Sequence, residues 1–334
     1  MNILYTVNDK YVPQITAGIC SILENNSDVS EIIFYVISDG ITNANREKLQ
    51  AFVQKYRKNN IRVIKFIELD NLSQYLNFDF DTLAWNNVIL ARLLMGRLLP
   101  KTVSRLIYLD GDTIVRGNLS ELWNLELEGN ILAASPEPTV RKEQVETLGM
   151  PSTDLYCNSG VLLVDLVAWR AQAAEEQIFT FYKKHDGKLF AADQDAINGA
   201  LQGRIKYLPP KYNFGSLHYY YPYKLMKKLA KPAEYLSKND YLEARKNPII
   251  VHFLGEDRPW REGNAHPYKK EFYKYLNLTP WKGLEKETGW KTYFLFFNTF
   301  NVLTRPFPAV RYKVINSLIP TMMKIRARKL NSKK

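Results

Sequence analysis

The sequence predicts an α/β fold in which helices flank a mostly parallel sheet. Over the first 67 residues, short apolar runs alternate with helical segments in a β-α-β-α-β order, which is typical of such sheets. The chain has 334 residues and a hydrophobic content of 46%, enough for one large domain or two smaller ones. In sheets of this kind, ligands bind beyond the carboxyl ends of the strands.

The first part of the chain contains this alternation. We expect strands at residues 3–7, 32–37 and 61–67, and helices at residues 12–24 and 42–58. Pro13 is tolerated in a first helical turn and Thr42 is a good N-cap, so both residues support the helix starts. Residues 70–87 are predicted to form a loop, and the helix expected over residues 88–99 carries Arg92.

The elements expected after residue 100 are less regular in their spacing. They are strands at residues 105–109, 131–135, 158–165, 205–208 and 249–255, and helices at residues 119–125, at 167–184 and from 193 onward. A long loop is expected at residues 136–153, and long loops in compact domains are often functional. Residues 211–247 are rich in Tyr and Lys and receive no assignment.

Two carboxylates, Asp110 and Asp112, follow the apolar strand at residues 105–109. Residues i and i+2 of a strand point to the same side, so both carboxylates can converge on one ion. Hard oxygen ligands suit Mg²⁺ or Mn²⁺, particularly where phosphates complete the coordination shell. The alternative is an ordinary polar turn, in which Asp and Gly are common.

His252 lies inside a later apolar run that leads to Gly255 and Arg258. A histidine in such a run is more often a core residue with satisfied hydrogen bonds than a ligand. A neutral imidazole nevertheless suits Mn²⁺ beside two carboxylates. Glycine lets the backbone approach a ligand closely, and arginine binds anions in a bidentate manner.

The phosphate-binding loops of two large enzyme classes are missing from the sequence. No Gly-x-Gly-x-x-Gly follows the first strand, and no Gly-x-x-x-x-Gly-Lys-Ser/Thr occurs. These absences argue against a dinucleotide oxidoreductase and against a P-loop enzyme. A nucleotide bound here would be held by a metal ion and by side chains.

The net charge of +12 comes mainly from the C-terminal region. Residues 291–334 contain ten Lys or Arg and no Asp or Glu, which leaves 36 basic and 34 acidic residues elsewhere. A nearly neutral body argues against a nucleic-acid enzyme, and we expect no nucleic-acid partner. The basic tail is expected to meet an anionic surface.

Residues 290–303 of this tail are strongly aromatic, and residues 312–330 have apolar residues with basic ones between them. Neither stretch reaches the length of about 20 apolar residues that a membrane span needs. The composition is typical of a segment that lies in a membrane interface. The alternative is a helical subdomain that packs on the body and exposes a basic face.

The expected location is the cytoplasm, with peripheral attachment to the inner face of the cell membrane. The chain has only two cysteines, Cys20 and Cys157, which favours a reducing compartment. Met1 and the residues after it lack the basic and apolar regions of a signal peptide and predict a strand instead.

Several segments together resemble glycosyltransferase family 8 over about residues 1–262. They are the turn ending in Tyr11, Ala91-Arg92-Leu93, Tyr108-Leu109-Asp110-Gly111-Asp112, Asn158-Ser159-Gly160-Val161-Leu162-Leu163, Asp193-Gln194-Asp195, and His252-Phe253-Leu254-Gly255 with Pro259-Trp260. This family comprises retaining α-hexosyltransferases and includes bacterial lipopolysaccharide galactosyltransferases and glycogenin. Each segment alone is common, whereas their order and spacing are specific.

The resemblance implies a GT-A fold, which is built on a Rossmann-like sheet. A catalytic domain is expected at residues 1–265, with a nucleotide-sugar half at about 1–115 and an acceptor half at about 116–265. Residues 266–334 form the basic and aromatic region that associates with membranes.

The resemblance also implies the roles of individual residues. Mn²⁺, or Mg²⁺, would be bound by Asp110, Asp112 and His252. The UDP-sugar would be held by Thr6, Val7, Asn8, Tyr11, Arg92, Asp110, Gly111, Asp112, Asn158, Gly255 and Arg258. Gln194 and Asp193 are the candidate catalytic residues at the donor hexose, and Glu137 and Trp260 would face the acceptor. Four positions depart from the family pattern, namely Asn8, Lys10, Glu137 and Arg258.

The expected reaction moves an α-hexose from a UDP-hexose to a saccharide, with galactose favoured and glucose next. The acceptor is expected to be lipid-linked and to belong to capsule or lipopolysaccharide synthesis. An amide is a poor nucleophile, so Gln194 favours same-face attack by the acceptor hydroxyl over double displacement. Two alternatives are a metal-dependent phosphohydrolase, which Asp110-Gly111-Asp112-Thr113 loosely matches, and a binding module without turnover.

Overall fold

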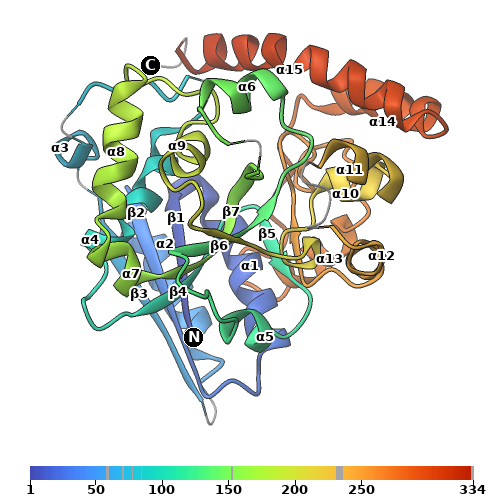
Figure 1. Ribbon diagram of the computed structural model, residues 1–334. Coiled ribbons are helices and arrows are strands. Elements are labelled where there is room, and N and C mark those ends of the chain that lie inside the picture. Colours follow the sequence, from blue (N-terminus) through green and yellow to red (C-terminus); the bar gives the residue numbers. More distant parts are fainter. Residues whose placement is uncertain are drawn as a thin grey trace.

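The computed structural model describes residues 1–57, 60–69, 71–76, 78–83, 85–151, 153–230 and 236–331, with side chains to residue 328. In this part of the chain, seven strands form one sheet in the order β3-β2-β1-β4-β7-β6-β8 (Figure 1). The strands are β1 (Asn2–Asn8), β2 (Glu31–Asp39), β3 (Ile61–Glu68), β4 (Arg105–Leu109), β6 (Leu132–Pro136), β7 (Cys157–Asp165) and β8 (Ile205–Tyr207). Parallel pairs join β3, β2, β1 and β4, and also β6 and β8. β7 runs antiparallel between β4 and β6. The predicted mostly parallel sheet is confirmed.

The two helices expected near the N-terminus are present. They are α1 (Val12–Asn25), with Pro13 in its first turn, and α2 (Asn43–Gln54). The hydroxyl of Thr42 accepts a hydrogen bond from the backbone N–H of Asn45, as expected of an N-cap. The end predicted for this helix, at residue 58, lies outside the described residues. A short 3₁₀ turn, η1 (Asp9–Tyr11), joins β1 to α1.

Four sequence predictions, for two helices and two loops, are corrected by the structure. The helix expected at residues 88–99 is a 3₁₀ segment, η2 (Asn87–Leu94), followed by the short α4 (Met95–Leu98). All residues from 90 to 95 are buried, so tertiary packing overrides helix propensity there. The helix expected at 167–184 divides into α7 (Leu166–Ala171) and α8 (Ala174–Lys184), because Ala173 has a φ of 51°. The loops at 70–87 and 136–153 contain α3 (Ser73–Leu76) and α6 (Lys142–Thr147).

A second, two-stranded sheet brings distant segments together. It pairs β5 (Thr113–Val115) with β9 (Ile250–His252) in antiparallel register, with Thr113 opposite His252. The remaining elements are α5 (Ser120–Trp123), α9 (Asp193–Ala200), η3 (Pro210–Tyr212), α10 (Ser216–Tyr220), α11 (Tyr223–Leu229), α12 (Lys238–Lys246), α13 (Lys269–Leu276), α14 (Lys291–Thr304) and α15 (Pro308–Asn331). The β5–β9 register places the carboxylate pair after β4 beside the histidine of β9.

The sheet is buried on both faces. Ile3, Tyr5 and Val7 of β1 belong to one core cluster, together with residues of α1 and α13, and Leu4 belongs to a second cluster on the other face. This alternation follows from the two-residue period of a strand. The core therefore holds the carboxyl ends of β1 and β4 rigidly beside each other.

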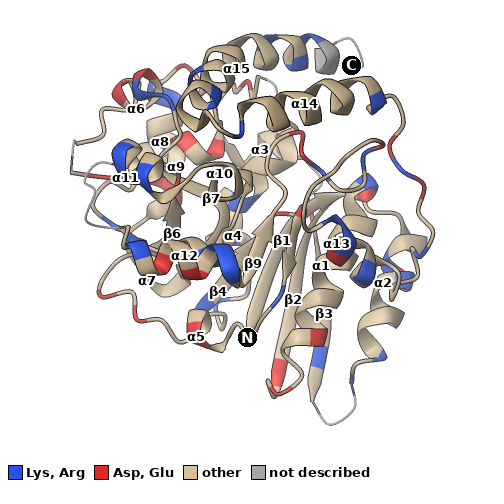
Figure 2. Cartoon of the chain, turned by 90° about the vertical axis from the view of Figure 1, so that its right-hand side faces the viewer, with Lys and Arg blue, Asp and Glu red and all other residues tan. Residues whose placement is uncertain are grey.

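Helices α14 and α15 lie across the end of the molecule opposite the N-terminus (Figures 1 and 2). They are docked on the body, since Phe294 is fully buried and Arg311 stacks 4.0 Å from the ring centroid of Tyr220. Arg311 also donates to the hydroxyl of Tyr221 at 3.0 Å and to Asn301 at 2.8 Å. Among the described residues, no helix is both long and apolar enough to cross a membrane.

Candidate active site

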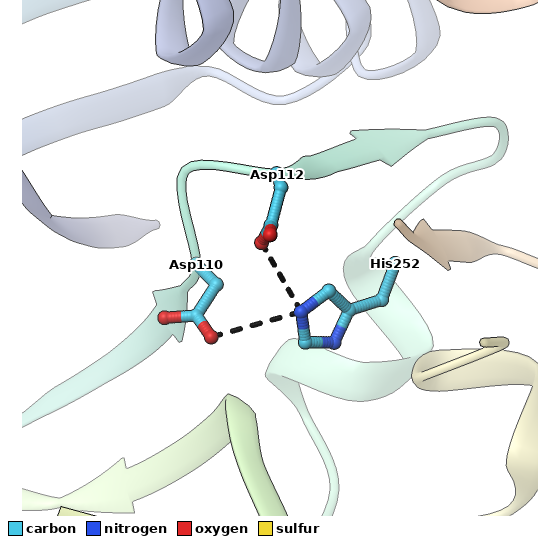
Figure 3. A group of neighbouring side chains, drawn as sticks. All are labelled: Asp110, Asp112 and His252. Atoms are coloured by element: carbon cyan, nitrogen blue, oxygen red, sulfur yellow. Dashed lines mark ion pairs between the residues drawn. The ribbon is translucent and has the colours of Figure 1, made fainter. Parts of the chain in front are cut away.

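Asp110, Asp112 and His252 converge at the carboxyl end of β4 (Figure 3). The Nε2 of His252 lies 3.2 Å from Oδ1 of Asp112 and 3.6 Å from Oδ2 of Asp110. One potential ligand atom from each residue lies within 4.8 Å of the other two. Two carboxylates and an imidazole form a donor set that suits Mn²⁺ or Mg²⁺, so the three predicted ligands can hold such an ion.

A chain of hydrogen bonds determines which nitrogen of His252 faces the carboxylates. The backbone N–H of Gly160 donates to Oδ1 of Asn158 at 3.0 Å, and Asn213 donates its amide to the same oxygen at 2.8 Å. The carbonyl oxygen of Asn213 therefore points to Nδ1 of His252, at 2.9 Å. Nδ1 must donate this bond, which leaves the lone pair of Nε2 directed at the metal position in the neutral imidazole.

The surroundings of the cluster favour the charged forms of Asp112 and His252. Burial alone would raise the pKa of Asp112, but the adjacent His252 and Arg258 outweigh it and hold that pKa well below its usual range. Burial opposes a positive charge on His252, yet the carboxylates of Asp112 and Asp110 raise its pKa. The site therefore keeps the Asp112 carboxylate ionised and attracts a cation.

Arg92 is buried and connects the cluster of Asp110, Asp112 and His252 to α9. Its guanidinium lies 2.8 Å from Asp110 and 3.2 Å from Asp193, and it donates to the backbone oxygen of Ser159 at 3.0 Å. It also stacks 4.4 Å from the ring centroid of Tyr108. Its charge is thus shared between two carboxylates that lie on different elements.

Asp193 and Gln194, the two candidate catalytic residues, are already engaged with the protein. Asp193 pairs with Arg92 and accepts a hydrogen bond from the hydroxyl of Ser159 at 3.0 Å. Burial raises the pKa of Asp193 to about 6, and Arg92 opposes that rise. The Gln194 oxygen accepts from the backbone of Ser159 at 3.0 Å, and its nitrogen donates to Tyr156 at 3.0 Å. Both side chains are held in one orientation.

Glu137 lies next to this pair on the other side of Gln194. Its Oε2 accepts hydrogen bonds from Asn158 at 3.0 Å and from Gln194 at 3.3 Å. Burial raises its pKa despite these two bonds. Glu137, Asn158 and Gln194 therefore form one connected group, as expected if donor-hexose and acceptor positions adjoin.

The expected nucleotide side lies at the end of β1. The hydroxyl of Thr6 lies 3.1 Å from that of Tyr108, and Val7 is buried in the core. Arg258 contacts Asp112 at 3.1 Å and donates to the hydroxyl of Tyr11. A Cβ on Gly111 would lie 3.3 Å from the ring of Tyr11.

Two buried polar atoms here have no hydrogen-bond partner within the described part of the chain, Oδ1 of Asn8 and Nε of Arg258. A buried polar group without a partner costs free energy, so these atoms indicate a polar ligand. An acceptor on Asn8 and a cationic donor on Arg258 fit a nucleobase N–H and a phosphate oxygen respectively.

Comparison with known proteins agrees with this geometry. The model of the family described as Glycosyl transferase family 8 matches residues 2–264. The chain belongs to this family. It is therefore a glycosyltransferase, and the resemblance identified from its motifs is confirmed.

Three relatives align with most of the chain. General stress protein A of Bacillus subtilis (strain 168) is 29% identical over 286 residues, which cover 84% of this chain and 94% of that protein. A lipopolysaccharide 1,2-glucosyltransferase of Escherichia coli (strain K12) is 28% identical and covers 84% of this chain and 79% of its own length. A lipopolysaccharide 1,3-galactosyltransferase of Salmonella typhimurium (strain LT2) is 22% identical, with the same coverage.

A solved structure confirms the fold. The galactosyltransferase LgtC, crystallised with donor and acceptor sugar analogues, superposes with a TM-score of 0.71 at 23% identity. The match covers 87% of this chain and 99% of LgtC. The predicted GT-A fold is thus confirmed, with the basic and aromatic C-terminal helices as an addition to the sheet and its flanking helices.

Two residues that the motifs singled out lie at the edge of the site. Gly255 has a φ of 67°, and among the described residues nothing would lie within 4 Å of a Cβ there. The indole of Trp260 is 1% exposed and donates to Glu287 at 3.0 Å. Its ring meets that of Tyr11 edge-on at 6.2 Å. In this structure Trp260 packs behind Tyr11, and its expected role at the acceptor stays a prediction.

Gly160 and Asn213 also shape the candidate site, although neither role was predicted from the sequence. A Cβ on Gly160 would lie 2.2 Å from Cε1 of His252 and 2.7 Å from Oδ2 of Asp110, so only glycine leaves room for this cluster. Gly160 lay inside a recognised motif but received no role. Asn213 lies in residues 211–247, which received no assignment. The only signal for it is that a polar residue stands shortly after Pro209-Pro210, where a strand ends.

Proposed function

We propose that this glycosyltransferase moves a hexose from a UDP-hexose to a saccharide acceptor, with galactose the favoured sugar and glucose next. Retention of the α configuration is part of the proposal. The observation that carries it is the convergence of a carboxylate-imidazole cluster, Arg258 and the unpartnered oxygen of Asn8 at the ends of β4 and β1. Such a set fits a nucleoside diphosphate bound through a metal ion.

The donor would lie along the site with its uracil near Asn8 and Tyr11. Asp110, Asp112 and His252 would hold Mn²⁺ or Mg²⁺, which when bound supplies positive charge for the diphosphate. Arg258, from the turn that Gly255 makes, would add a planar donor fork to that diphosphate. Arg92 would hold Asp110 and Asp193 in place, since it contacts both.

The hexose would lie between Asn158, Asp193 and Gln194. Both amide atoms of Gln194 are engaged by neighbouring groups, and the carboxylate of Asp193 is paired with Arg92. These contacts support positioning roles and disfavour either side chain as a nucleophile. We therefore infer same-face attack by the acceptor hydroxyl, with the departing phosphate as the base that takes its proton. Glu137 would face the acceptor.

We further propose that the acceptor is a lipid-linked saccharide of bacterial capsule or lipopolysaccharide synthesis. Two relatives carry names of lipopolysaccharide glycosyltransferases, which supports this class. Residues 1–265 would form the catalytic domain, with a nucleotide-sugar half at 1–115 and an acceptor half at 116–265. Within residues 266–334, α13 packs with α1 in the core, so α14 and α15 would contact the membrane.

The outer face of α14 and α15 supports attachment to the inner, anionic face of a membrane. Among the described residues of this hairpin, large apolar side chains are exposed to solvent at nine positions, namely Leu295, Phe296, Val302, Leu303, Phe307, Val310, Leu318, Met322 and Ile325. Figure 2 shows Lys and Arg, but no Asp or Glu, on both helices. An apolar surface of this size with cations around it is typical of an interfacial helix pair.

UDP release tests the proposed reaction. The full chain would be assayed with UDP-galactose and UDP-glucose in Mn²⁺, with membrane lipid extract as a source of acceptor and p-nitrophenyl phosphate as a rival substrate. Release of UDP from one donor above the other supports the proposal. Phosphate release from the monoester alone, or donor binding without UDP release, would contradict it.

A further inference from the structure

The end of α15 reaches the donor site through Arg326. The guanidinium of Arg326 lies 3.6 Å from Oε1 of Glu256 and 4.6 Å above the ring centroid of Trp85. Its side chain is 29% exposed, whereas the neighbouring Ile325 and Arg328 are exposed on the outer face of the helix. Helix α15 is therefore not only a membrane-facing element, because the side chain of Arg326 points toward the proposed donor site.

The two partners of Arg326 come from segments far apart in the sequence, each beside residues of the proposed donor site, and we call these two segments the walls of that site. Trp85 lies in the loop before η2, and its indole N–H donates to the backbone oxygen of Phe190 at 3.1 Å, just before the start of α9. Glu256 lies between Gly255 and Arg258, in the turn that leads to the proposed diphosphate contact. Arg326 thus bridges the wall that carries Asp193 to the wall that carries Arg258.

The charges around Arg326 indicate that an anion belongs nearby. Burial and the neighbouring cation Arg258 lower the pKa of Arg326, while Glu256 and Tyr11 oppose that shift. Glu256 is shared, since its carboxylate also pairs with Arg261. Glu256 therefore serves both Arg261 and Arg326, and a further anion bound between Arg326 and Arg258 would reduce the repulsion between those two cations.

We propose that α15 is a strap across the nucleotide end of the donor site, and that Arg326 is the latch that holds it closed over the bound nucleoside diphosphate. This proposal rests on the proposed function, which places a nucleoside diphosphate in the site. The latch consists of the Arg326–Trp85 stack and the Arg326–Glu256 ion pair. UDP leaves when these contacts part, so Arg326 is a positioning residue that governs the release of the leaving nucleotide.

The test measures the dissociation rate of UDP in Mn²⁺ by surface plasmon resonance on the immobilised full chain. We compare wild type with Arg326→Gln, Trp85→Leu and the double variant. The strap predicts that each single variant speeds UDP dissociation about fivefold to tenfold, since a stacked cation is worth roughly that factor. The double variant should be no faster than the faster single variant, because both changes break one latch. Arg328→Gln, which removes the same charge from an exposed position of the same helix, should leave the rate unchanged.

A second readout follows the helix itself. UDP with Mn²⁺ should slow hydrogen exchange of residues 316–328 in wild type and have a smaller effect in Arg326→Gln. If wild type and Arg326→Gln have the same UDP dissociation rate and the same hydrogen exchange, the strap proposal is overturned. The proposed function would remain intact. Faster dissociation in Arg326→Gln without any change in Trp85→Leu would also overturn it, because the cation would then act on the diphosphate directly. A wild-type chain that fails to bind UDP in Mn²⁺ would overturn both proposals.

Discussion

The Nδ1–H of His252 donates to the amide oxygen of Asn213 at 2.9 Å, and this bond directs Nε2 toward Asp110 and Asp112. The orientation of Asn213 is set in turn by Asn158, whose oxygen is already taken by the backbone of Gly160. The tautomer of the proposed metal ligand is thus determined by residues that do not touch the metal position. Partners of this kind commonly change metal affinity when they are replaced.

Asn213→Ala should weaken Mn²⁺ binding by about 10–100-fold, because the imidazole loses the bond that fixes its tautomer and ring orientation. Isothermal titration of the chain with Mn²⁺ measures this directly. Asn277→Ala, at an exposed position after α13, is the matched control and should bind Mn²⁺ as wild type does. Unchanged affinity in Asn213→Ala would show that His252 needs no such support.

Gly160→Ala should abolish metal binding while the sheet still forms. The added methyl would lie 2.2 Å from the ring of His252 and 2.7 Å from Asp110, so one of these two ligands must move. We expect UDP release to fall about 100-fold or more, as with other displaced catalytic groups. Asn277→Ala, the exposed control variant named above, should bind Mn²⁺ and release UDP as wild type does. Normal Mn²⁺ affinity in Gly160→Ala would mean that the close approach of β7 is unimportant.

Replacing exposed apolar residues of the tail should release the chain from membranes. Phe296 and Leu303 are 70% and 68% exposed, and the loss of each side chain should weaken binding to anionic vesicles about tenfold. Co-sedimentation of Phe296→Ser and Leu303→Ser with such vesicles measures the effect. Leu242→Ser, which changes a leucine that is 50% exposed on α12, should sediment as wild type does. Equal sedimentation of all four proteins would contradict the membrane proposal.

Point substitutions test the tail more sharply than its removal does. Deletion from residue 290 onward would also uncover Tyr220 and Tyr221, which contact Arg311 of α15. If the truncated chain failed to sediment with vesicles, the cause could be either the loss of membrane contact or misfolding, and the experiment would not tell them apart. The substituted residues lie on the outer face and have no such packing role.

The buried His218 should make stability depend on pH. Burial, aided by Arg245, lowers the pKa of His218 to about 3 in the folded chain. The unfolded chain then takes up a proton first as pH falls, so the stability that neutral His218 provides is complete above pH 6.5 and declines between pH 6.5 and 3. Between pH 7 and pH 5 this loss amounts to about 2 kcal/mol.

His218→Gln isolates this contribution from that of other titrating groups. The difference in unfolding free energy between wild type and His218→Gln, from urea denaturation, should shrink by about 2 kcal/mol between pH 7 and pH 5. His185→Gln, at a partly exposed position of the α8 end, provides the comparison. A difference that stays constant between the two pH values would contradict a neutral buried His218.

The positions of most strands were predictable from the sequence, but their directions in the sheet were not. Apolar runs identify β1, β2, β3 and β4 because buried strands need continuous hydrophobic residues. No local feature distinguishes the antiparallel β7 from its parallel neighbours, since direction depends on how distant segments connect. The break at Ala173 was also unpredictable, because alanine is a strong helix former and adopts a left-handed conformation there only through its tertiary surroundings.

The candidate site also contains residues that were predictable from the sequence and residues that were not. The pair Asp110 and Asp112 was predictable because carboxylates at positions i and i+2 after a strand can converge on one ion, and His252 was assigned to the same ion through the resemblance to glycosyltransferase family 8. Asn213 acts through His252, and its role depends on a hydrogen bond between residues 39 positions apart. The inward turn of Arg326 within a tail of otherwise interfacial composition depends on the docking of α15, which no local pattern encodes.

The most direct test of the central claim is UDP release from the favoured donor by wild type and Asp112→Asn, each with Mn²⁺ and with chelator. Asp112→Asn keeps the size of the side chain and removes the charge that lies beside His252 and Arg258. Wild type should release UDP only with the metal, and Asp112→Asn should lose about 100-fold or more of this activity while it remains folded. Equal UDP release by both proteins, or by wild type in chelator, would contradict a metal-dependent transferase built on Asp110, Asp112 and His252.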